Sequence, residues 1–414
     1  MPADRLLLVA QPESYRIAPY VLAAKRMGLE VLIASRGKHS LISDVNNGLH
    51  IELDDPDQAC RTIVQESRQR PFTGILGSDD STVELAARVA NELGLPHNPP
   101  SAARFSRRKD MARARLSAAG CPVPKHGLID LERPLENQMT DLPWPCVIKP
   151  LNLSASRGVI RADDPGAFVR ACERTGKIIS GSGNDISASH VLVEEYIAGI
   201  EVAFEGFLCN GELRTLVVFD KPDPLEGPYF EETIYVTPSR LDHDTLAMIQ
   251  RRVALACQAY GLTTGPVHAE LRIDERDAWV LEVASRTIGG DCARTLDMDD
   301  GLNLEELAIA LATGRPVRAE PPPEARGVMM IPIEKRGILR RVEGILAASR
   351  VPHIDKIDII AREGRELIPL PEGNQYPGYI FARADSPEEV VTALREAHAR
   401  LNFVVAPLLR VTPG

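Results

Sequence analysis

The sequence predicts an α/β protein that begins with an open parallel sheet and continues with a run of antiparallel strands. Apolar strands and amphipathic helices alternate through the first hundred residues, an order typical of parallel sheets covered by helices. Between residues 189 and 219, consecutive strands bend at Gly199 and reverse at Asn210–Gly211. The chain has 414 residues and an apolar fraction of 44%, enough for two or three domains with real cores.

The first part of the chain contains the elements that a parallel sheet needs. Strands are expected over 5–10, 29–35, 50–55 and from 72, and helices over 17–28, from about 57 and over 82–94. The first strand-to-helix turn has no G-x-G-x-x-G, so no dinucleotide site is expected there. Ser78, Asp79 and Asp80 lie where a strand ends and a helix begins. They either face a ligand or cap the helix, and the pattern favours capping.

The remaining elements follow in a regular order. Strands flank the polar loop after residue 150, a helix runs from about 244 to 261, and a hairpin spans 267–290. A helix over 303–314, a Pro-rich linker, short strands from about 328 and a closing helix over about 387–401 complete the chain.

Charge and cysteine content exclude several classes of protein. The formal net charge is −10, whereas nucleic-acid-binding surfaces are basic, so no nucleic-acid partner is expected. The seven cysteines stand singly, without metal or redox spacing, and we expect reduced, buried thiols in a cytoplasmic protein. Neither an 18-residue apolar run nor a signal peptide is recognised, so no membrane partner is expected.

Two glutamates oppose each other in the hairpin "VHAELRIDERDAWVLEVASRTIGG". With a three-residue turn over Glu275–Asp277, Glu270 faces Glu282. Like charges in that position are destabilising unless a cation lies between them, and Mg²⁺ prefers carboxylate and phosphate oxygens. The alternation that puts His268, Glu270 and Arg272 on one face also fits an exposed sheet surface. A magnesium site and an exposed face remain equal alternatives at this point.

Three more segments suit a nucleotide. Lys149 ends an apolar strand, and the small polar residues after it can bring backbone amides close to phosphate. Glu194 and Glu201 flank a strand break, where backbone groups and a carboxylate could meet adenine and ribose. Arg286 follows in the hairpin, where a guanidinium suits phosphate or carboxylate, and Gly289–Gly290 allow close approach of a ligand. Each segment alone also fits a plain turn or surface; together they indicate a Mg–nucleotide site.

In the order and spacing of these motifs, the chain resembles the ATP-grasp superfamily. The resemblance covers most of the sequence. It implies an N-terminal parallel α/β domain (1–100), an ATP-grasp domain (101–315) with a lid at about 122–200 and a metal-binding antiparallel sheet, and a C-terminal subdomain (316–414). It further implies that ATP lies between two antiparallel sheets together with Mg²⁺, for which Mn²⁺ can substitute.

The resemblance also assigns the site residues. It implies that Glu270 and Glu282 are the metal ligands and that the catalytic residues are Arg286, Lys149 and Gly290. The implied ATP-binding residues are Lys109, Lys149, Ser154, Ser156, Arg157, Gly158, Glu194, Tyr196, Ile197 and Glu201. The implied substrate contacts are His268, Arg286, Gly289, Gly290, Lys221 and Glu232, although a structural hydrogen bond is the favoured interpretation of the histidine.

One position departs from the family pattern. The family usually reads Glu-x-Asn-x-Arg, with the asparagine as a further metal ligand, whereas "EVASR" has Ala284 there. This predicts either one strongly held Mg²⁺ or a second ion held mainly by ATP and water.

Within the superfamily, "HAE", "SRTIGG", "SYR" and the long C-terminal part are similar to L-amino-acid ligases. The resemblance implies an ATP-dependent carboxylate–amine ligase that joins small-molecule acids and amines, with an amino acid expected among them, through an acylphosphate; it is compatible with a homodimer. Ala284 keeps two alternatives open: formyl or carboxyl transfer to a phosphoribosyl substrate, and a non-catalytic nucleotide-binding protein. The first alternative requires a basic cluster near the catalytic arginine, for which the candidates are Arg294, Lys335, Arg336, Arg340 and Arg341.

Overall fold

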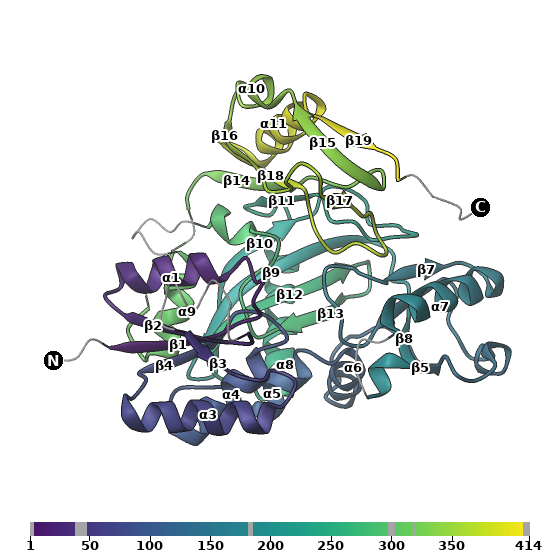
Figure 1. Cartoon of the computed structure of the whole chain (residues 1–414). Helices are drawn as coiled ribbons and strands as arrows, with labels where there is room; N and C mark the ends of the chain where they lie inside the picture. Colours follow the sequence, from purple (N-terminus) through teal and green to yellow (C-terminus); the bar gives the residue numbers. More distant parts are fainter. Residues whose placement is uncertain are drawn as a thin grey trace, which may run out of the picture.

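The computed structural model describes residues 4–37, 48–180, 185–296, 303–317, 319–320 and 322–408, which form four sheets. Figure 1 shows the N-terminal part and the lid on opposite sides of a long central sheet, with the C-terminal part above them. The α/β architecture is the one that the sequence predicts.

The N-terminal sheet is parallel, as predicted, with strand order β3-β2-β1-β4. Its strands are β1 (Arg5–Val9), β2 (Glu30–Ser35), β3 (Gly48–His50) and β4 (Gly74–Gly77). The third strand ends at residue 50, so the expected strand over 50–55 is mostly a turn instead. Helices α3 (Pro56–Gln69) and α4 (Val83–Leu93) cover one face of the sheet. Helix α1 (Ile17–Arg26) and the distant helix α9 (Leu304–Ala312) cover the other, as a parallel sheet requires.

Helix α9 joins the N-terminal sheet to the central one. Every residue of the helix is buried, including Glu306, which pairs with Arg26, so the helix has packing partners on all sides. Ala308 and Ile309 pack with the core of the N-terminal sheet, whereas Leu304, Leu307 and Leu311 pack with the core of the central sheet. The two parts therefore share one packed helix.

The lid is a separate antiparallel sheet of order β5-β8-β6-β7. Its elements are β5 (His126–Asp130), β6 (Cys146–Pro150), β7 (Ile160–Ala162), β8 (His190–Glu195) and helix α7 (Pro165–Ile179). Phe168, Cys172 and Ile179 of the helix are buried against the sheet. Helices α5 (Pro100–Phe105) and α6 (Lys109–Ala118) connect the N-terminal part to the lid.

The central sheet is antiparallel and has the strand order β13-β12-β9-β10-β11-β14-β18-β16. Its strands are β9 (Ile200–Cys209), β10 (Glu212–Asp220), β11 (Ile234–Thr237), β12 (Gly265–Ile273), β13 (Ala278–Ala284), β14 (Ala325–Met330), β16 (Ile354–Ile359) and β18 (Gly378–Ala384). Helices α8 (His243–Tyr260) and α11 (Pro387–Ala399) pack on it. The C-terminal part thus extends the same sheet with β14, β18 and β16. Strands β15 (Gly337–Glu343), β17 (Glu366–Leu367) and β19 (Asn402–Ala406) form a separate sheet, and Ala348 of helix α10 (Ile345–Ala348) packs in the same core as α11.

Packing against α8 decides which face of β12 is free for chemistry. Val267, Ala269 and Leu271 are buried against that helix in one core. Because side chains alternate along a strand, His268, Glu270 and Arg272 point to the opposite face.

The cysteines and the helices bear on the expected thiol state and on membrane insertion. The seven cysteines are all free thiols, six of them buried, as predicted. In the described part of the chain, no helix has the length and apolar character needed to cross a membrane.

Candidate active site

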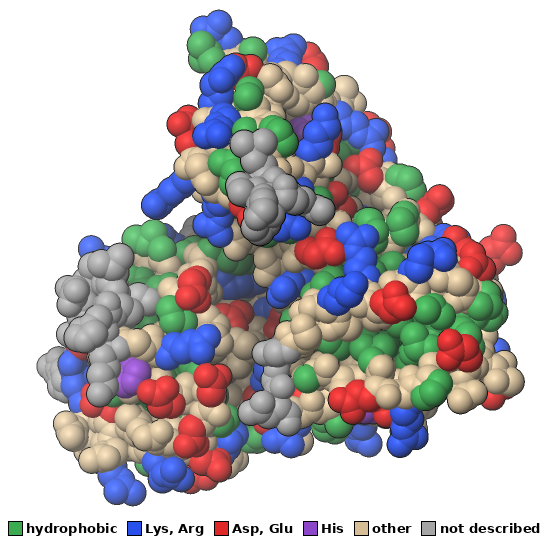
Figure 2. Space-filling model, turned by 45° about the vertical axis from the view of Figure 1, so that its right-hand side comes forward, with side chains coloured by type: hydrophobic (Ala, Val, Ile, Leu, Met, Phe, Trp, Pro, Cys, Tyr) green, Lys and Arg blue, Asp and Glu red, His purple; other side chains and the backbone are tan. Residues whose placement is uncertain are grey.

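A cavity of about 1180 Å³ lies where the N-terminal part, the lid, the central sheet and the C-terminal part meet. The face in Figure 2 is hollowed between these parts, and charged side chains of both signs gather there. Every residue assigned above to a catalytic, nucleotide, metal or substrate role lines this cavity, except Gly158 and Lys221. The fold therefore collects into one place residues that span almost two hundred positions of the sequence.

The two glutamates of the hairpin are direct partners, as predicted, but the predicted turn is wrong. Ile273 pairs with Ala278, so the loop has four residues, 274–277, and not three. A bulge after Glu270 shifts the pairing by one residue and restores the Glu270–Glu282 pair. The loop is longer because Asp274 accepts hydrogen bonds from the backbone amides of residues 276 and 277 and from the indole of Trp279. The extra residue of the bulge compensates for the loop that is one residue longer than predicted.

The glutamates face the cavity and not bulk solvent. Their neighbours His268 and Arg272 on the same face of β12 are only 6% and 3% exposed, so the exposed-face alternative is wrong. Glu270 Oε1 lies 3.2 Å from Lys221 Nζ, and Glu282 Oε2 lies 3.3 Å from Lys109 Nζ. Two carboxylates on adjacent strands, both lining one cavity, fit the oxygen preference of Mg²⁺.

The position where the family has asparagine offers no third ligand. Ala284 is fully buried and ends β13. The donors of this chain therefore support one protein-held ion better than two, and the number of ions stays a prediction.

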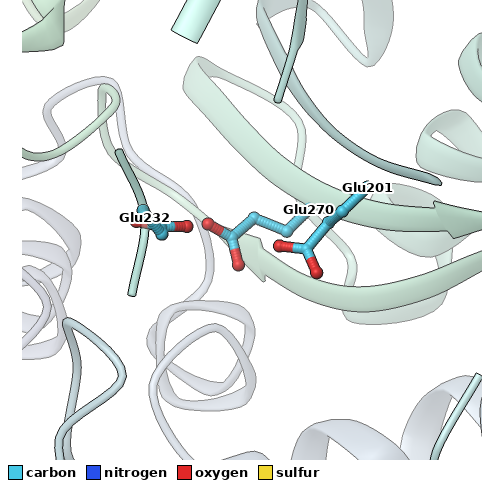
Figure 3. Close-up of side chains that lie close together, drawn as sticks. All are labelled: Glu201, Glu232 and Glu270. Carbon is cyan, nitrogen blue, oxygen red and sulfur yellow. The ribbon is translucent and has the colours of Figure 1, made fainter. Parts of the chain in front are cut away.

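A buried lysine joins three carboxylates beside the predicted metal position. The Nζ of Lys221 lies 2.8 Å from Glu201, 2.5 Å from Glu232 and 3.2 Å from Glu270. Figure 3 shows Glu270 pointing toward Glu232, with Glu201 beside it on the neighbouring strand. Among the described residues these three carboxylates form a group whose oxygens lie within 4.8 Å of one another, and Glu282 is not a member. Lys221 is thus a counter-charge beneath the cavity wall, and not a residue of its lining.

The lysine changes the protonation of this group. Burial alone would raise the pKa of Glu270, but Lys221 and His268 hold it well below its usual range. Burial raises the pKa of Glu232 to about 7 despite the same lysine, and Tyr235 Oη donates a hydrogen bond to that carboxylate at 2.7 Å. Of Glu270 and Glu232, Glu270 is therefore the one that stays ionised.

Lys149 is held by a buried carboxylate. Its Nζ lies 2.6 Å from Glu194, whose other oxygen accepts a hydrogen bond from Arg113 Nε at 2.5 Å. Glu194 is 1% exposed. Burial would raise the pKa of Glu194, but the two cations lower it to about 2. The carboxylate is therefore an anchor for the lysine. Its second partner, Arg113, lies 81 residues away on α6 and was not among the predicted site residues.

The segment predicted to bind adenine, residues 194–197, already forms several contacts with other parts of the protein. The amide of Tyr196 donates to Pro145 O, and Ile197 O accepts a hydrogen bond from Arg272. The ring of Tyr196 has the guanidinium of Arg161 at 4.1 Å and that of Arg272 at 4.9 Å from its centre. Both oxygens of Glu201 are occupied, by Lys221 and by Arg272. Each carboxylate oxygen can accept a second hydrogen bond, and the expected ribose contact of Glu201 stays a prediction.

The loop after Lys149 meets the C-terminal part over the cavity. Ala155 and Ser156 have φ of 55° and 52°, and Gly158 has φ of 73°, so the loop turns tightly. The Gly158 amide donates to Pro371 O at 2.8 Å, and Arg157 Nε donates to Glu372 O at 3.1 Å. Gly158 therefore lies behind the cavity wall, whereas Ser154, Ser156 and Arg157 line the cavity, as expected.

Glu372 reinforces this contact through the lid helix. It forms a two-point ion pair with Arg174 of α7, with distances of 2.7 and 2.9 Å. We call this ion pair the strap to the lid helix. It could not be predicted from the sequence because its partners lie almost 200 residues apart.

Arg286 is held by the N-terminal part. Its Nε and Nη2 donate to the two oxygens of Asp80 at 2.8 and 2.9 Å. The expectation that Ser78, Asp79 and Asp80 cap a helix is wrong, because α4 begins at Val83 with Thr82 at the N-cap position. The segment at the end of β4 instead reaches the cavity through Asp79 and Asp80.

Gly290 and His268 have clear structural roles. Gly290 has φ of 60°, and a Cβ there would lie 2.6 Å from Met330 Sδ, so the position needs glycine. His268 Nδ1 lies 3.2 Å from Glu205 and Nε2 lies 3.8 Å from Glu270. Burial opposes protonation of His268, but the hydrogen bond with Glu205 and the nearby carboxylate of Glu270 raise its pKa to about 9.

The basic cluster required for a phosphoribosyl substrate does not assemble at the cavity. Of its five candidates, Arg294 lines the cavity, and its Nη1 is paired with Asp291 and Asp358. Arg336 pairs with Glu366. The remaining members are not in the cavity lining.

Comparisons with known proteins agree with this site. Three family profiles match the chain in order: the ATP-grasp N-terminal domain at residues 21–97, the ATP-grasp domain at 142–295, and the L-amino acid ligase C-terminal domain 2 at 329–406. The crystal structure of L-amino acid ligase from Bacillus licheniformis superposes with a TM-score of 0.82 at 24% identity, covering 97% of this chain and 99% of that one.

Two curated relatives have different activities in their names. Alanine–anticapsin ligase of Bacillus subtilis is 23% identical over 278 residues, which cover 63% of this chain and 58% of that ligase. Formate-dependent phosphoribosylglycinamide formyltransferase of Bordetella bronchiseptica is 25% identical over 366 residues, 85% of each chain.

The fold and the site together define an ATP-grasp enzyme, and the chain belongs to the ATP-grasp superfamily. Within that superfamily it resembles the L-amino-acid ligases, because the C-terminal part that closes over the cavity matches their C-terminal domain. The recognition made from the sequence motifs is confirmed.

Proposed function

We propose that the protein is an ADP-forming ligase that joins a carboxylic acid to an amine, with an amino acid among its substrates. One observation supports this most strongly: a single cavity is lined by Lys109 and Lys149, by Glu270 and Glu282, and by Arg286. Two cations for phosphate, two oxygen donors for a metal and a guanidinium for an anion are the parts that ATP-driven activation of a carboxylate needs. The match of the C-terminal part to L-amino-acid ligases supports an amino-acid substrate.

The proposed reaction has two steps. A carboxylate oxygen of the acid attacks the γ-phosphorus of ATP, the bond to the β-phosphate oxygen breaks, and an acylphosphate and ADP form. The amine nitrogen then attacks the acyl carbon, the bond to the phosphate oxygen breaks, and phosphate leaves as the nitrogen loses its proton. Both steps shift negative charge, so positioning and charge neutralisation are the main work of the protein.

The residues of this chain divide that work. Lys149, anchored by Glu194, and Lys109 at the start of α6 would face the phosphates. Arg286 would hold the transferred phosphoryl group and the substrate carboxylate, with the backbone of Gly289–Gly290 beside it. The loop over residues 154–158 would exclude water, which hydrolyses acylphosphates.

Glu270 and Glu282 would hold Mg²⁺, which supplies charge neutralisation at the phosphates when bound. Mn²⁺ takes similar oxygen ligands, so we expect it to substitute. A homodimer, compatible with the family resemblance, stays a prediction.

The proposal is tested by ADP release over pairs of amino acids and other acids and amines with Mg²⁺–ATP, with mass spectrometry of the product. We expect ADP release that needs both an acid and an amine, and a product equal to their sum less water. ADP release that stays at baseline across the panel would contradict the proposal.

Two alternatives give different results in the same assays. Turnover with a phosphoribosyl amine and formate or bicarbonate, but not with amino acids, would favour the purine-type activity. The relative from Bordetella bronchiseptica supports this alternative. The five basic candidates, which do not assemble at the cavity, weigh against it. Glu282→Gln separates catalysis from binding. A variant that binds ATP but has lost turnover supports an enzyme, whereas unchanged turnover excludes catalysis at this metal position.

A further inference from the structure

The segment Arg286–Ile288 is held by side chains from three distant parts of the chain. Asp80, at the end of β4, binds the guanidinium of Arg286 in a two-point ion pair across 206 positions of sequence. Arg16, which precedes α1, donates to Thr287 Oγ1 at 2.7 Å and to Ile288 O at 2.7 Å. Glu205, on β9, accepts a hydrogen bond from the Ile288 amide at 3.1 Å. The N-terminal part therefore contacts both the side chain and the backbone of this segment.

The hydrogen bonds leave one edge of the Arg286 guanidinium for a ligand. A guanidinium has five N–H donors in a planar fork. The side edge, formed by Nε and Nη2, is taken by the two oxygens of Asp80, and Nη1 donates to Thr287 O at 2.9 Å. In the described part of the chain, no residue accepts a hydrogen bond from the two remaining hydrogens, one on each Nη, so the end edge between Nη1 and Nη2 keeps N–H groups that can donate. That edge is the one that can bind a carboxylate or a phosphate at two points.

We propose that Asp80 is a positioning residue that directs the end edge of Arg286 into the cavity, with Arg16 fixing the backbone beneath it. This inference rests on the proposed function for the anion that Arg286 receives. It explains why the N-terminal part, which supplies none of the metal or nucleotide residues assigned above, packs against the site. The pair is also a fixed charge arrangement: Asp80 is ionised, because Arg286 holds its pKa below the usual value against the effect of burial.

The kinetic test compares Asp80→Asn with a matched control. Arg252 and Asp277 form the same side-edge ion pair at 2.8 and 2.7 Å, and neither lines the cavity, so Asp277→Asn removes an equivalent pair elsewhere. Because a small misplacement of a catalytic group costs about 10²-fold, we expect Asp80→Asn to lower kcat by about 10²-fold with little change in KM for ATP. Asp277→Asn should keep both constants within about twofold.

A double-mutant cycle asks whether Asp80 acts through Arg286. In the background of Arg286→Lys, which keeps the charge but lacks the fork, Asp80→Asn should cost no more than about twofold. An equal loss in both backgrounds, or a loss in Asp80→Asn no larger than in Asp277→Asn, would overturn the proposal.

A binding test separates this inference from the proposed activity. Inorganic phosphate is titrated calorimetrically into each protein saturated with Mg²⁺ and ADP. We expect phosphate to bind the wild type and Asp277→Asn alike and Asp80→Asn about tenfold more weakly, a difference of about 1.4 kcal/mol. Equal phosphate affinity in all three proteins, or no phosphate binding to the wild type, would refute the positioning role even if ligase activity is found. If the wild type shows no turnover but the three phosphate affinities have the expected order, only the proposed activity is refuted.

Discussion

Glu194→Gln should destabilise the protein strongly, although the substitution keeps the shape of the side chain. Glu194 is 1% exposed and is the shared partner of Arg113 and Lys149. Its pKa is lowered from 4.5 to about 2, and each unit corresponds to about 1.4 kcal/mol, so the ionised carboxylate contributes about 3 kcal/mol to folding. Loss of one partner of a buried ion pair costs about 3–5 kcal/mol in other proteins. The pKa shift and the cost of breaking a buried ion pair therefore give similar losses of folding free energy.

Urea unfolding at pH 7 measures this loss. Because m is about 1–3 kcal/mol/M, a loss of about 3 kcal/mol lowers the midpoint of the transition that includes the lid by about 1–3 M. Trp144 lies in the lid against Phe168, and its fluorescence reports that part of the molecule. The matched control is Glu195→Gln on the same strand, since Glu195 is half-buried and has no ion pair with the lysine or arginine.

The pH dependence has a definite sign. The pKa of Glu194 is lower in the folded protein, so its stabilisation is fully present above about pH 4.5 and is lost as the pH falls from 4.5 toward 2. The difference between wild type and Glu194→Gln should therefore be constant from pH 5 to 8 and shrink below pH 4.5. A difference under about 1 kcal/mol at pH 7, or an equal loss in Glu195→Gln, would refute the assignment of Glu194 as the shared counter-charge.

Three further substitutions test other parts of the site. Lys221→Met leaves three carboxylates within 4.8 Å of one another without their cation, so we expect a loss of about 3–5 kcal/mol that Mg²⁺ or Mn²⁺ partly restores in thermal melts; a melting temperature insensitive to both ions would contradict this. Glu372→Gln breaks the strap to the lid helix, so hydrogen exchange at residues 154–158 should become about tenfold faster, and unchanged exchange would show that the strap does not order the loop. Gly290→Ala places a Cβ 2.6 Å from Met330 Sδ at φ of 60°, so it should lower the melting temperature by several degrees and abolish ADP release, which a Met330→Ala second change should not fully restore because the backbone remains strained.

Local patterns predicted the elements because their determinants are local. Helix α8 ends at Gly261, as expected, and its N-cap is Asp242. The parallel N-terminal sheet follows from alternating strands and helices. Gly199, with φ of 119°, lies at the predicted bend between β8 and β9, where a Cβ would lie 2.1 Å from Ile273 O. Each of these features depends on a few neighbouring residues or on backbone sterics.

The hairpin shows how a correct pair can come from an inaccurate local picture. The pairing of Glu270 with Glu282 depends on where the loop is centred and on any bulge beside it. The predicted register at these two residues was correct, although the loop length was not. Hydrogen bonds to Asp274 lengthen the loop by one residue, and the bulge adds one unpaired residue to β13, which restores the pair. The position of the bulge cannot be read from the alternation of residue types.

The partners of the site residues could not be predicted, because they come from far along the chain. Arg113 reaches Glu194 across 81 positions, and Asp80 reaches Arg286 across 206. Local interpretation of the aspartate favoured a helix cap, which is the common role of such a residue. The recognition from motifs identified which residues line the cavity, whereas the charges that hold them depend on how three parts of the chain pack together.

These partners form a consistent electrostatic arrangement. Three of the cations assigned to phosphate or substrate are already paired at the cavity: Lys109 with Glu282, Lys149 with Glu194 and Arg286 with Asp80. Paired cations cost less to bury than bare ones, so the cavity can stay folded without nucleotide. The pairs differ in one respect, because Glu282 is also an expected metal ligand, whereas Glu194 and Asp80 are not. A divalent ion at Glu282 competes for the carboxylate that now faces Lys109, and leaves that ammonium group for phosphate. The metal and the nucleotide are then expected to bind together, because the ion releases one phosphate-binding cation while two others keep their fixed positions.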